Sequence, residues 1–214
     1  MDTTKTIIRN KNYKNLMPNT NSSTIKVQKR DGKLEILDIN KIHFVVEEAC
    51  EGLTGVSSSQ IEMNANIQFY DGMTTKDIQN VLVRSANDLI SLDAPNYQYA
   101  AARLLSYDVR KEAHGQYEYV PLLKLIVRNI RLGVYDKGIV ENYTSTEIKK
   151  LNTWIKRERD LNFTYAGLRQ VMDKYLVQDR SSGTLYETPQ DMYMMIAATL
   201  FANYPKKTRL SYIK

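Results

Sequence analysis

The sequence predicts a mainly α-helical protein with one short β-hairpin near its beginning and a second small hairpin in its second half. Three observations favour this fold class. Apolar residues recur at helical spacing in most segments, helix-starting and helix-ending residues stand at the borders of these segments, and strand-favouring residues occur only in short runs around turn signals. The chain has 214 residues, which suits one large domain or two small ones.

The first hairpin is expected over residues 25–37. Asp31-Gly32 is a strong two-residue turn signal, because glycine adopts positive φ without a steric penalty. Asp38 is the expected N-cap of the helix that follows, and Gly52 is its expected end. The apolar stripe of this helix consists of Ile42, Val45, Val46, Ala49, Cys50 and Leu53.

Three more helices are expected to complete a first unit over residues 25–114. Their expected ranges are 58–70, 75–92 and, after Pro95, a stretch that runs to about residue 113. Thr74 with Asp77 three residues later is a capping signal for the second of these helices. Gly115 is the expected stop of the last one.

Residues 115–214 are expected to form a second unit. The expected elements are a helix over 121–132, a helix after the Thr144-x-x-Glu147 capping box, a helix over 165–174, short strands at 175–178 and 184–187, and a helix capped by Thr188-Pro189. The last residues, KKTRLSYIK, begin an amphipathic helix without an end signal. We therefore expect this unit to be truncated or completed by another chain.

Composition and charge argue against several classes of protein. The sequence contains no run of about 18 apolar residues, so no transmembrane helix is predicted. Residues 1–24 lack the apolar core of a secretory signal. Because they are polar and aperiodic, we expect residues 1–24 to form a disordered basic arm. A single cysteine, Cys50, argues against an internal disulfide and a Cys-x-x-Cys zinc site, so the cytoplasm is the expected location. The net charge of +6 is compatible with a polyanionic partner.

The cationic hairpin that leads into a helix N-terminus is the candidate binding site. Lys29, Arg30 and Lys41 could form charge-assisted contacts with a phosphate, which backbone N–H groups at a helix N-terminus also attract. Glu35 could accept hydrogen bonds from a base or a ribose. The same residues also fit a solvated surface hairpin, and spacing leaves both interpretations open. No Ser/His/Asp constellation, carboxylate pair or metal-ligand set stands out, so no catalytic or metal site is predicted.

Several blocks of the sequence resemble one enzyme family. In chain order they are VQKRDG, DINKI, IQFYDGMTTKDI, DAPNYQYAAARL and VRKEAHGQYE, then RERDLNFTYAGLRQVMDKYLVQDR, GTLYETPQDMYM and LFANYPKKTRLSYIK. The first group resembles the N-terminal ATP-cone of the large (α) subunit of class I ribonucleotide reductase, bacterial or phage type. The second group resembles the all-helical segment at the start of the barrel domain. The resemblance implies an ATP-cone (a hairpin plus four helices) over 25–114 and an N-terminal helical domain, incomplete at its end, over 115–214.

The resemblance implies that ATP or dATP binds as an allosteric effector, with Mg²⁺, and that no cofactor is bound covalently. The positions that match the nucleotide contacts of the family are Lys29, Glu35, Ile36, Leu37, Asp38, Ile39, Asn40, Lys41, Thr75 and Lys111. In these roles the lysines would neutralise phosphates and the threonine could donate its hydroxyl group. In the family ATP favours activity, and dATP inhibits through a change in subunit assembly.

Four positions depart from the pattern of the family. Gln79 and Asp108 stand where fuller sites carry histidines, Phe44 stands where a cation is expected, and Asp38 replaces the usual asparagine. An acid at position 108 would repel a triphosphate unless it pairs with Lys111 or a metal ion. We therefore expect a cone that folds but binds nucleotide weakly, or that has lost inhibition by dATP.

The resemblance also implies partners. The family reduces ribonucleotides to deoxyribonucleotides for DNA synthesis with cysteines that Cys50, the single thiol here, does not match. The implied function is the N-terminal portion of a ribonucleoside-diphosphate reductase large subunit. It would act in an oligomer with the cysteine-bearing remainder of that subunit, supplied by another chain, and with the radical-generating small (β) subunit. The alternative is a stand-alone nucleotide-sensing cone without catalysis. No membrane partner is expected, and no nucleic acid either, because no basic face with interleaved aromatic residues is visible.

Overall fold

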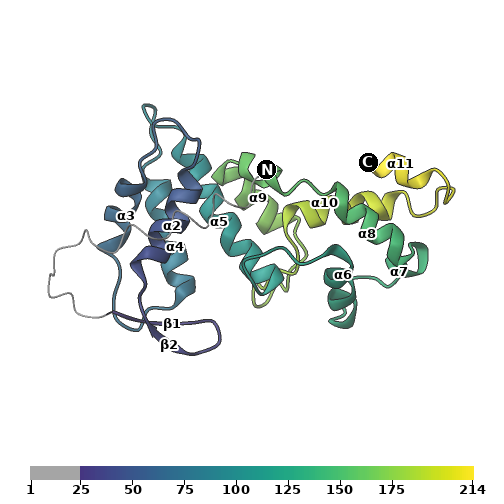
Figure 1. Ribbon diagram of the computed structural model, residues 1–214, viewed down its shortest axis with the longest axis horizontal. Helices are drawn as coiled ribbons and strands as arrows, with labels where there is room; N and C mark the ends of the chain where they lie inside the picture. The colour runs from purple at the N-terminus through teal and green to yellow at the C-terminus, as the bar shows by residue number, and fades with distance from the viewer. Residues whose placement is uncertain (1–24) are drawn as a thin grey trace, which may run out of the picture.

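The computed structural model describes residues 25–214, so the arm expected over residues 1–24 lies outside the described residues. A two-stranded antiparallel sheet comes first, and helices and their connections form the rest (Figure 1). The strands are β1 (Lys26–Gln28) and β2 (Leu34–Ile36), paired so that Val27 lies opposite Glu35. The helices are α2 (Ile39–Cys50), α3 (Ser58–Asn66), α4 (Thr75–Asp88), α5 (Tyr97–His114), α6 (Leu122–Arg131), α7 (Gly138–Asn142), α8 (Ser145–Trp154), the 3₁₀ helix η2 (Arg157–Asn162), α9 (Tyr165–Lys174), α10 (Pro189–Leu200) and α11 (Arg209–Ile213). Within the described part of the chain, none of these helices has both the length and the apolar character needed to cross a membrane.

The first hairpin has a three-residue loop instead of the expected two-residue turn. The Lys29 N–H donates to the Lys33 carbonyl at 2.8 Å, so the ladder continues past β1. The Gly32 N–H donates to the Lys29 carbonyl at 2.9 Å, and Gly32 has a φ of +84°. A tight turn followed by a left-handed glycine is a common way to close a three-residue loop. Asp31-Gly32 therefore predicted the place of the turn correctly, but not its length.

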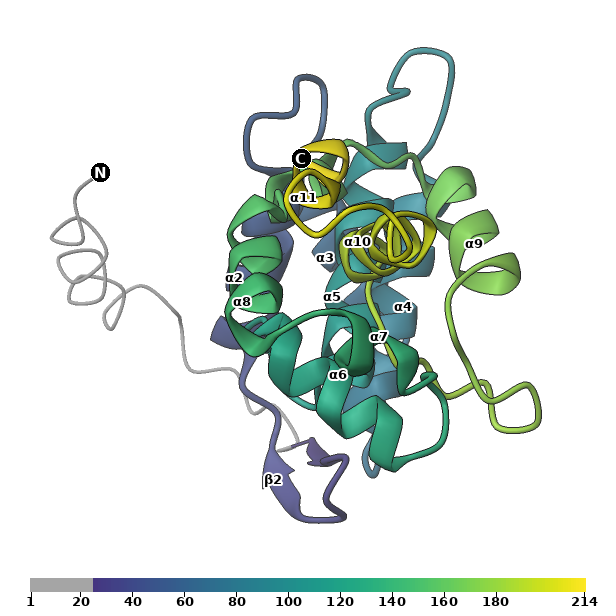
Figure 2. The ribbon, with the colours of Figure 1, turned by 90° about the vertical axis from the view of Figure 1, so that its right-hand side faces the viewer.

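Helices α2 to α5 pack with the hairpin around one hydrophobic cluster. The long helix α5 packs against α2 and α4, and α3 packs against the same two helices (Figures 1 and 2). Val27 of β1 is buried in this cluster and so fixes the inner face of the hairpin. The predicted caps are confirmed, because the Asp38 carboxylate accepts the Asn40 N–H at 3.0 Å and the Thr74 hydroxyl accepts the Asp77 N–H at 3.0 Å.

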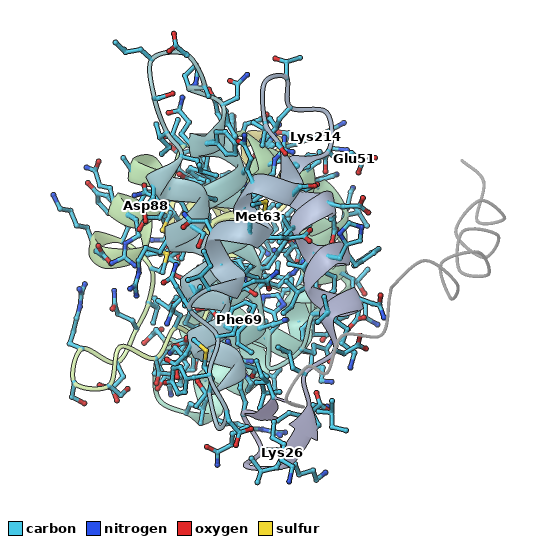
Figure 3. All side chains as sticks on the ribbon, turned by 90° about the vertical axis from the view of Figure 1, so that its left-hand side faces the viewer. Lys26, Glu51, Met63, Phe69, Asp88 and Lys214 are labelled. Carbon is cyan, nitrogen blue, oxygen red and sulfur yellow. The ribbon has the colours of Figure 1, made fainter. Side chains whose placement is uncertain are left out.

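The hairpin lies at one end of this helical unit. Figure 3 shows Lys26 of β1 at one end and Glu51, in the loop after α2, at the other. The Gln28 N–H donates to the Met73 carbonyl at 2.9 Å, and Gln28 forms a parallel bridge with Thr74. The hairpin, the N-terminus of α2 and the N-terminus of α4 are therefore neighbours.

The second half of the chain packs mainly around α6, α8 and α10. Their shared cluster consists of Leu122, Ile126, Ile139, Tyr143, Ile148, Leu151, Met194 and Ala198. The capping box of α8 is confirmed, with Thr144 and Glu147 bonded reciprocally. Thr188 is the N-cap of α10 as predicted, and Asp191 accepts hydrogen bonds from its backbone N–H and its hydroxyl. Helix α9 has the predicted bounds and packs against α5 of the first half (Figure 1).

Some predicted elements are wrong. The second hairpin has the predicted place but no strands: it is one antiparallel bridge between Gln178 and Leu185, with the Tyr186 N–H on the Val177 carbonyl at 3.0 Å. The Val177 N–H bonds to the Glu187 carboxylate and not to the backbone of the opposite segment. Helix α3 ends at residue 66, not 70, and α4 ends at residue 88, not 92, where the last N–H groups turn to carbonyls three residues back. Helices α7 and η2 were not predicted, since five or six residues are too few to form an apolar stripe.

A buried polar network joins the end of α5 to the start of α10. The Val120 N–H donates to Nδ1 of His114 at 2.8 Å, so Nε2 carries the proton and donates to Asp191 at 2.8 Å. Arg157 lies 2.6 Å from the other oxygen of Asp191. Burial opposes the charge on Asp191, but the contacts with His114 and Arg157 outweigh it and lower its pKa to about 2.

Two polar side chains near this network have no complete set of partners. Arg110 lies over the rings of Tyr117 and Tyr119, with centroid distances of 4.2 and 4.7 Å, but its Nε bonds to no group among the described residues. Asp160 is 2% exposed, and Gln190 donates to its Oδ1 at 3.0 Å while its Oδ2 has no hydrogen-bond partner in residues 25–214. Burial raises the pKa of Asp160 to about 6.

The Asp160→Asn variant is expected to be more stable than the natural protein at pH 8 by about 1–3 kcal/mol. The carboxyl binds its proton more tightly in the folded state, so its unfavourable contribution develops as the pH rises from about 4 to about 6. The gain should therefore disappear at pH 4. Urea unfolding at both pH values measures it, with the exposed Asp173→Asn as control. A variant that is less stable at pH 8 would contradict the prediction.

Candidate functional site

The first cation of the hairpin is paired across the loop. Nζ of Lys29 lies 2.8 Å from the carboxylate of Glu35 on β2. The hydrogen bond to Glu35 is the largest cause of a raised pKa of Lys29. Both side chains are partly open to solvent, so this ion pair contributes little to stability and can exchange Glu35 for another anion.

Arg30 joins the hairpin to α5. Its Nη2 lies 2.5 Å from Oδ1 of Asp108, whose side chain is 10% exposed. Burial raises the pKa of Asp108, and the charge of Arg30 opposes this effect. Lys111 lies one turn further along α5, and its pKa is lowered by burial and then by the nearby charge of Arg30. The ion-pair partner of Asp108 is therefore Arg30, whereas the sequence suggested Lys111 or a metal ion.

The segment 35–41 runs from β2 into the first turn of α2. Asp38 caps the helix, and its Oδ2 lies 3.8 Å from Nζ of Lys41. Ile36 and Ile39 are 62% and 56% exposed, so both side chains are open to contact with a flat ligand. The segment thus combines a helix N-terminus, which favours phosphate, with exposed apolar surface.

Thr75 is the first residue of α4 and is half-buried. Lys76, the next residue, pairs with Glu112 of α5 at 3.1 Å, so the start of α4 and the end of α5 lie close together. In the part of the chain that the structure describes, no hydrogen bond or ion pair joins Thr75 itself to Lys29 or Lys111. The fold therefore brings these positions to one end of the helical unit without direct contacts between all of them.

The departures from the family pattern have different structural roles. Gln79 is buried and donates to the Leu104 carbonyl at 2.8 Å, so it holds α4 to α5. Phe44 is 61% exposed on α2. Arg30 was predicted from the charge of the hairpin but is not among the positions that match the family, and Lys76 was not predicted at all. Asp108 and Glu112, four residues apart on one face of α5, were a signal for cationic partners.

The candidate site is a set of cations that are already matched by carboxylates. The four pairs are Lys29–Glu35, Arg30–Asp108, Lys41–Asp38 and Lys76–Glu112. A phosphate ligand would have to replace these carboxylates as the partner of each cation that it contacts. Of the three lysines among the predicted contacts, Lys29 and Lys41 are paired, and Lys111 forms no ion pair within residues 25–214.

Comparison with known proteins gives matches over both halves of the chain. Residues 25–112 match the family model described as the ATP cone domain, and residues 161–214 match the model of the ribonucleotide reductase all-alpha domain. The chain is 47% identical over 193 residues to ribonucleoside-diphosphate reductase 1 subunit alpha of Escherichia coli (strain K12), which is 90% of this chain and 25% of that protein. It is 40% identical over 181 residues to ribonucleoside-diphosphate reductase subunit alpha of Enterobacteria phage T4, which is 85% of this chain and 24% of that protein. The chain therefore spans about a quarter of the length of the curated relatives it matches.

Proposed function

We propose that the chain, which matches the ATP cone domain model over residues 25–112 and the ribonucleotide reductase all-alpha domain model over residues 161–214, forms the nucleotide-regulated N-terminal part of a ribonucleoside-diphosphate reductase α subunit. The observation that carries this proposal is the identity of 47% to the Escherichia coli subunit along 90% of the chain. A match that continues through residues 161–214 supports a part of the subunit over the alternative, a stand-alone sensing cone.

ATP or dATP is the effector in this proposal. The nucleotide contacts are Lys29, Glu35, Ile36, Leu37, Asp38, Ile39, Asn40, Lys41, Thr75 and Lys111. Arg30 is a further phosphate contact, because its guanidinium already holds an anion, the Asp108 carboxylate, on α5. Among the described residues no group of three or more His, Cys, Asp or Glu side chains could hold a metal ion. Mg²⁺ would therefore be held chiefly by the phosphates of the nucleotide.

In this proposal another polypeptide carries the cysteines that reduce the ribonucleotide. Burial raises the pKa of Cys50 to about 11, which leaves this thiol a poor nucleophile at neutral pH. The proposal divides the chain into a cone over 25–114 and a helical domain over 115–214. Its partners are the cysteine-bearing remainder of the α subunit and the radical-generating β subunit, in a cytoplasmic oligomer.

The Lys111→Ala variant is expected to bind ATP and dATP about tenfold more weakly than the natural protein, since a charge-assisted hydrogen bond is worth about 1.5–3 kcal/mol. Lys111 should show this effect because no carboxylate neutralises it within residues 25–214. Isothermal titration calorimetry at fixed ionic strength measures the affinity.

The matched control is Lys174→Ala, which removes an exposed cation from the last turn of α9. Equal affinities of the Lys111→Ala variant and the natural protein would show that Lys111 does not contact the phosphates. Absence of binding of either nucleotide to the natural protein would contradict the sensing role.

A further inference from the structure

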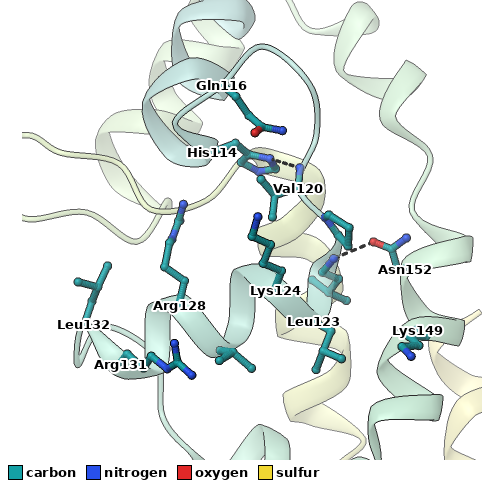
Figure 4. A pocket seen from close by; sticks show the side chains of 13 residues that line it. His114, Gln116, Val120, Leu123, Lys124, Arg128, Arg131, Leu132, Lys149 and Asn152 are labelled. Carbon is teal, nitrogen blue, oxygen red and sulfur yellow. Dashed lines mark hydrogen bonds between the residues drawn. The ribbon is translucent and has the colours of Figure 1, made fainter. Parts of the chain in front are cut away.

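A groove of about 790 Å³ lies along α6, outside the candidate nucleotide site (Figure 4). Its walls come from α6, from the loop before α6 and from α8. The apolar lining includes Leu123, Val127 and Leu132, and Leu132 is 57% exposed. None of the proposed nucleotide contacts lines it.

Helix α6 has one wide apolar stripe. Leu122, Leu125 and Ile126 are buried inside the second half of the chain. Leu123 and Val127, four residues apart, are half-buried and line the groove, and Leu123 also packs against the core of the second half. The apolar stripe of α6 therefore extends past its buried residues to the groove, and this uncovered edge has the character of an interface.

The charges around the groove are all of one sign. Lys124, Arg128 and Arg131 of α6 and Lys149 of α8 line it, and no acidic residue does (Figure 4). None of these four cations forms an ion pair within residues 25–214; Arg128 donates to the Tyr186 carbonyl at 3.0 Å. An apolar floor with a purely cationic rim is complementary to an amphipathic segment whose apolar face is flanked by Asp and Glu.

We propose that this groove is the docking site for an acidic amphipathic segment of the reductase α subunit, located in the part of that subunit beyond the quarter that this chain matches. The proposal rests on the proposed function, and it adds the surface and the chemistry of the contact. The length of the relatives supports this occupant, because three quarters of each α subunit lies outside the match.

The test compares the 214-residue chain alone with a full-length chimera in which it replaces the matched part of the Escherichia coli α subunit. A Val127→Cys thiol should react with a maleimide at least about tenfold more slowly in the chimera, because the docked segment covers it. Leu92→Cys is the control, since Leu92 is 100% exposed on a loop of the first half. Labelling is read at residue 127 alone, by mass spectrometry of the peptide that carries it, because Cys50 and the cysteines of the remainder of the α subunit are also present.

A charge variant tests the rim independently. Arg131→Glu should lower the unfolding temperature of the chimera but not that of the isolated chain, because Arg131 forms no ion pair within residues 25–214. Lys174→Glu, at the equivalent last turn of α9, should change neither.

Equal labelling of the Val127→Cys thiol in a folded chimera would overturn the docking proposal and leave the proposed function standing. Protection that appears in the isolated chain and grows with its concentration would also overturn it, because the occupant would then be a second copy. A chimera that does not fold would contradict the assignment to the α subunit itself, and the docking proposal with it.

Discussion

The Asp108→Asn variant is expected to bind ATP and dATP about tenfold more tightly than the natural protein, a gain of about 1.4 kcal/mol. In the folded chain the carboxylate of Asp108 lies 2.5 Å from Arg30, so it competes with phosphate for this cation. It also places a negative charge one turn from Lys111, where a triphosphate would be repelled. Asparagine keeps the shape of the side chain and removes both effects. Isothermal titration calorimetry of the two proteins at one ionic strength measures the change.

Asp93→Asn is the matched control for this experiment, because it removes the same charge from an exposed loop of the first half. Its affinity should equal that of the natural protein. If Asp108→Asn binds nucleotide more weakly instead, the carboxylate assists binding, and the competition with Arg30 is not the reason for weak binding.

The Asp191→Asn variant is expected to lose about 3–5 kcal/mol of unfolding free energy at pH 7, the cost of breaking a buried ion pair from one side. Asp191 is 0% exposed and accepts hydrogen bonds from His114 and Thr188 while it faces Arg157. An asparagine would leave the guanidinium of Arg157 without its charge partner and would turn an N–H toward groups that donate. Urea unfolding measures the loss.

The pH dependence of this loss has a definite sign. Because the pKa of Asp191 is lowered in the folded state, its contribution is present above about pH 4 and is lost as the pH falls toward 2. The difference between Asp191→Asn and the natural protein should shrink over that range. Asp173→Asn, which touches only the exposed partner Arg169, should lose less than about 0.5 kcal/mol at any pH. A loss of that small size in the Asp191 variant would show that the network does not hold the two halves together.

Helix starts could be predicted from the sequence because their chemistry is local. Asp38, Thr74, Thr144 and Thr188 each stand within three residues of the group they bond to, so a short stretch of sequence contains the whole interaction. The ends of α3 and α4 were predicted four residues too late, because the apolar spacing continues past the point where the N–H groups turn to carbonyls three residues back. The second hairpin was predicted at the right place but with strands that are too long, because the Glu187 side chain, and not a backbone carbonyl, accepts the Val177 N–H.

The candidate site was predicted as a list of positions but not as a set of pairs. The family resemblance selected residues of the hairpin, the start of α2, the start of α4 and α5, and these elements do meet at one end of the first unit. The pair of Arg30 and Asp108 joins residues 78 positions apart, so it follows only from how α5 lies against the hairpin. The network of His114 and Asp191, 77 positions apart, was unpredicted for the same reason.

Helix α5 carries Asp108 toward the proposed effector and His114 toward the second half of the chain. The two residues are six positions apart on one continuous helix, a distance of about 9 Å along its axis. A rigid helix cannot tilt or rotate at one of these points without moving the other. Asp108 and His114 therefore move together. A nucleotide that separates Arg30 from Asp108 would shift α5 less than two helical turns from its contact with the second half of the chain.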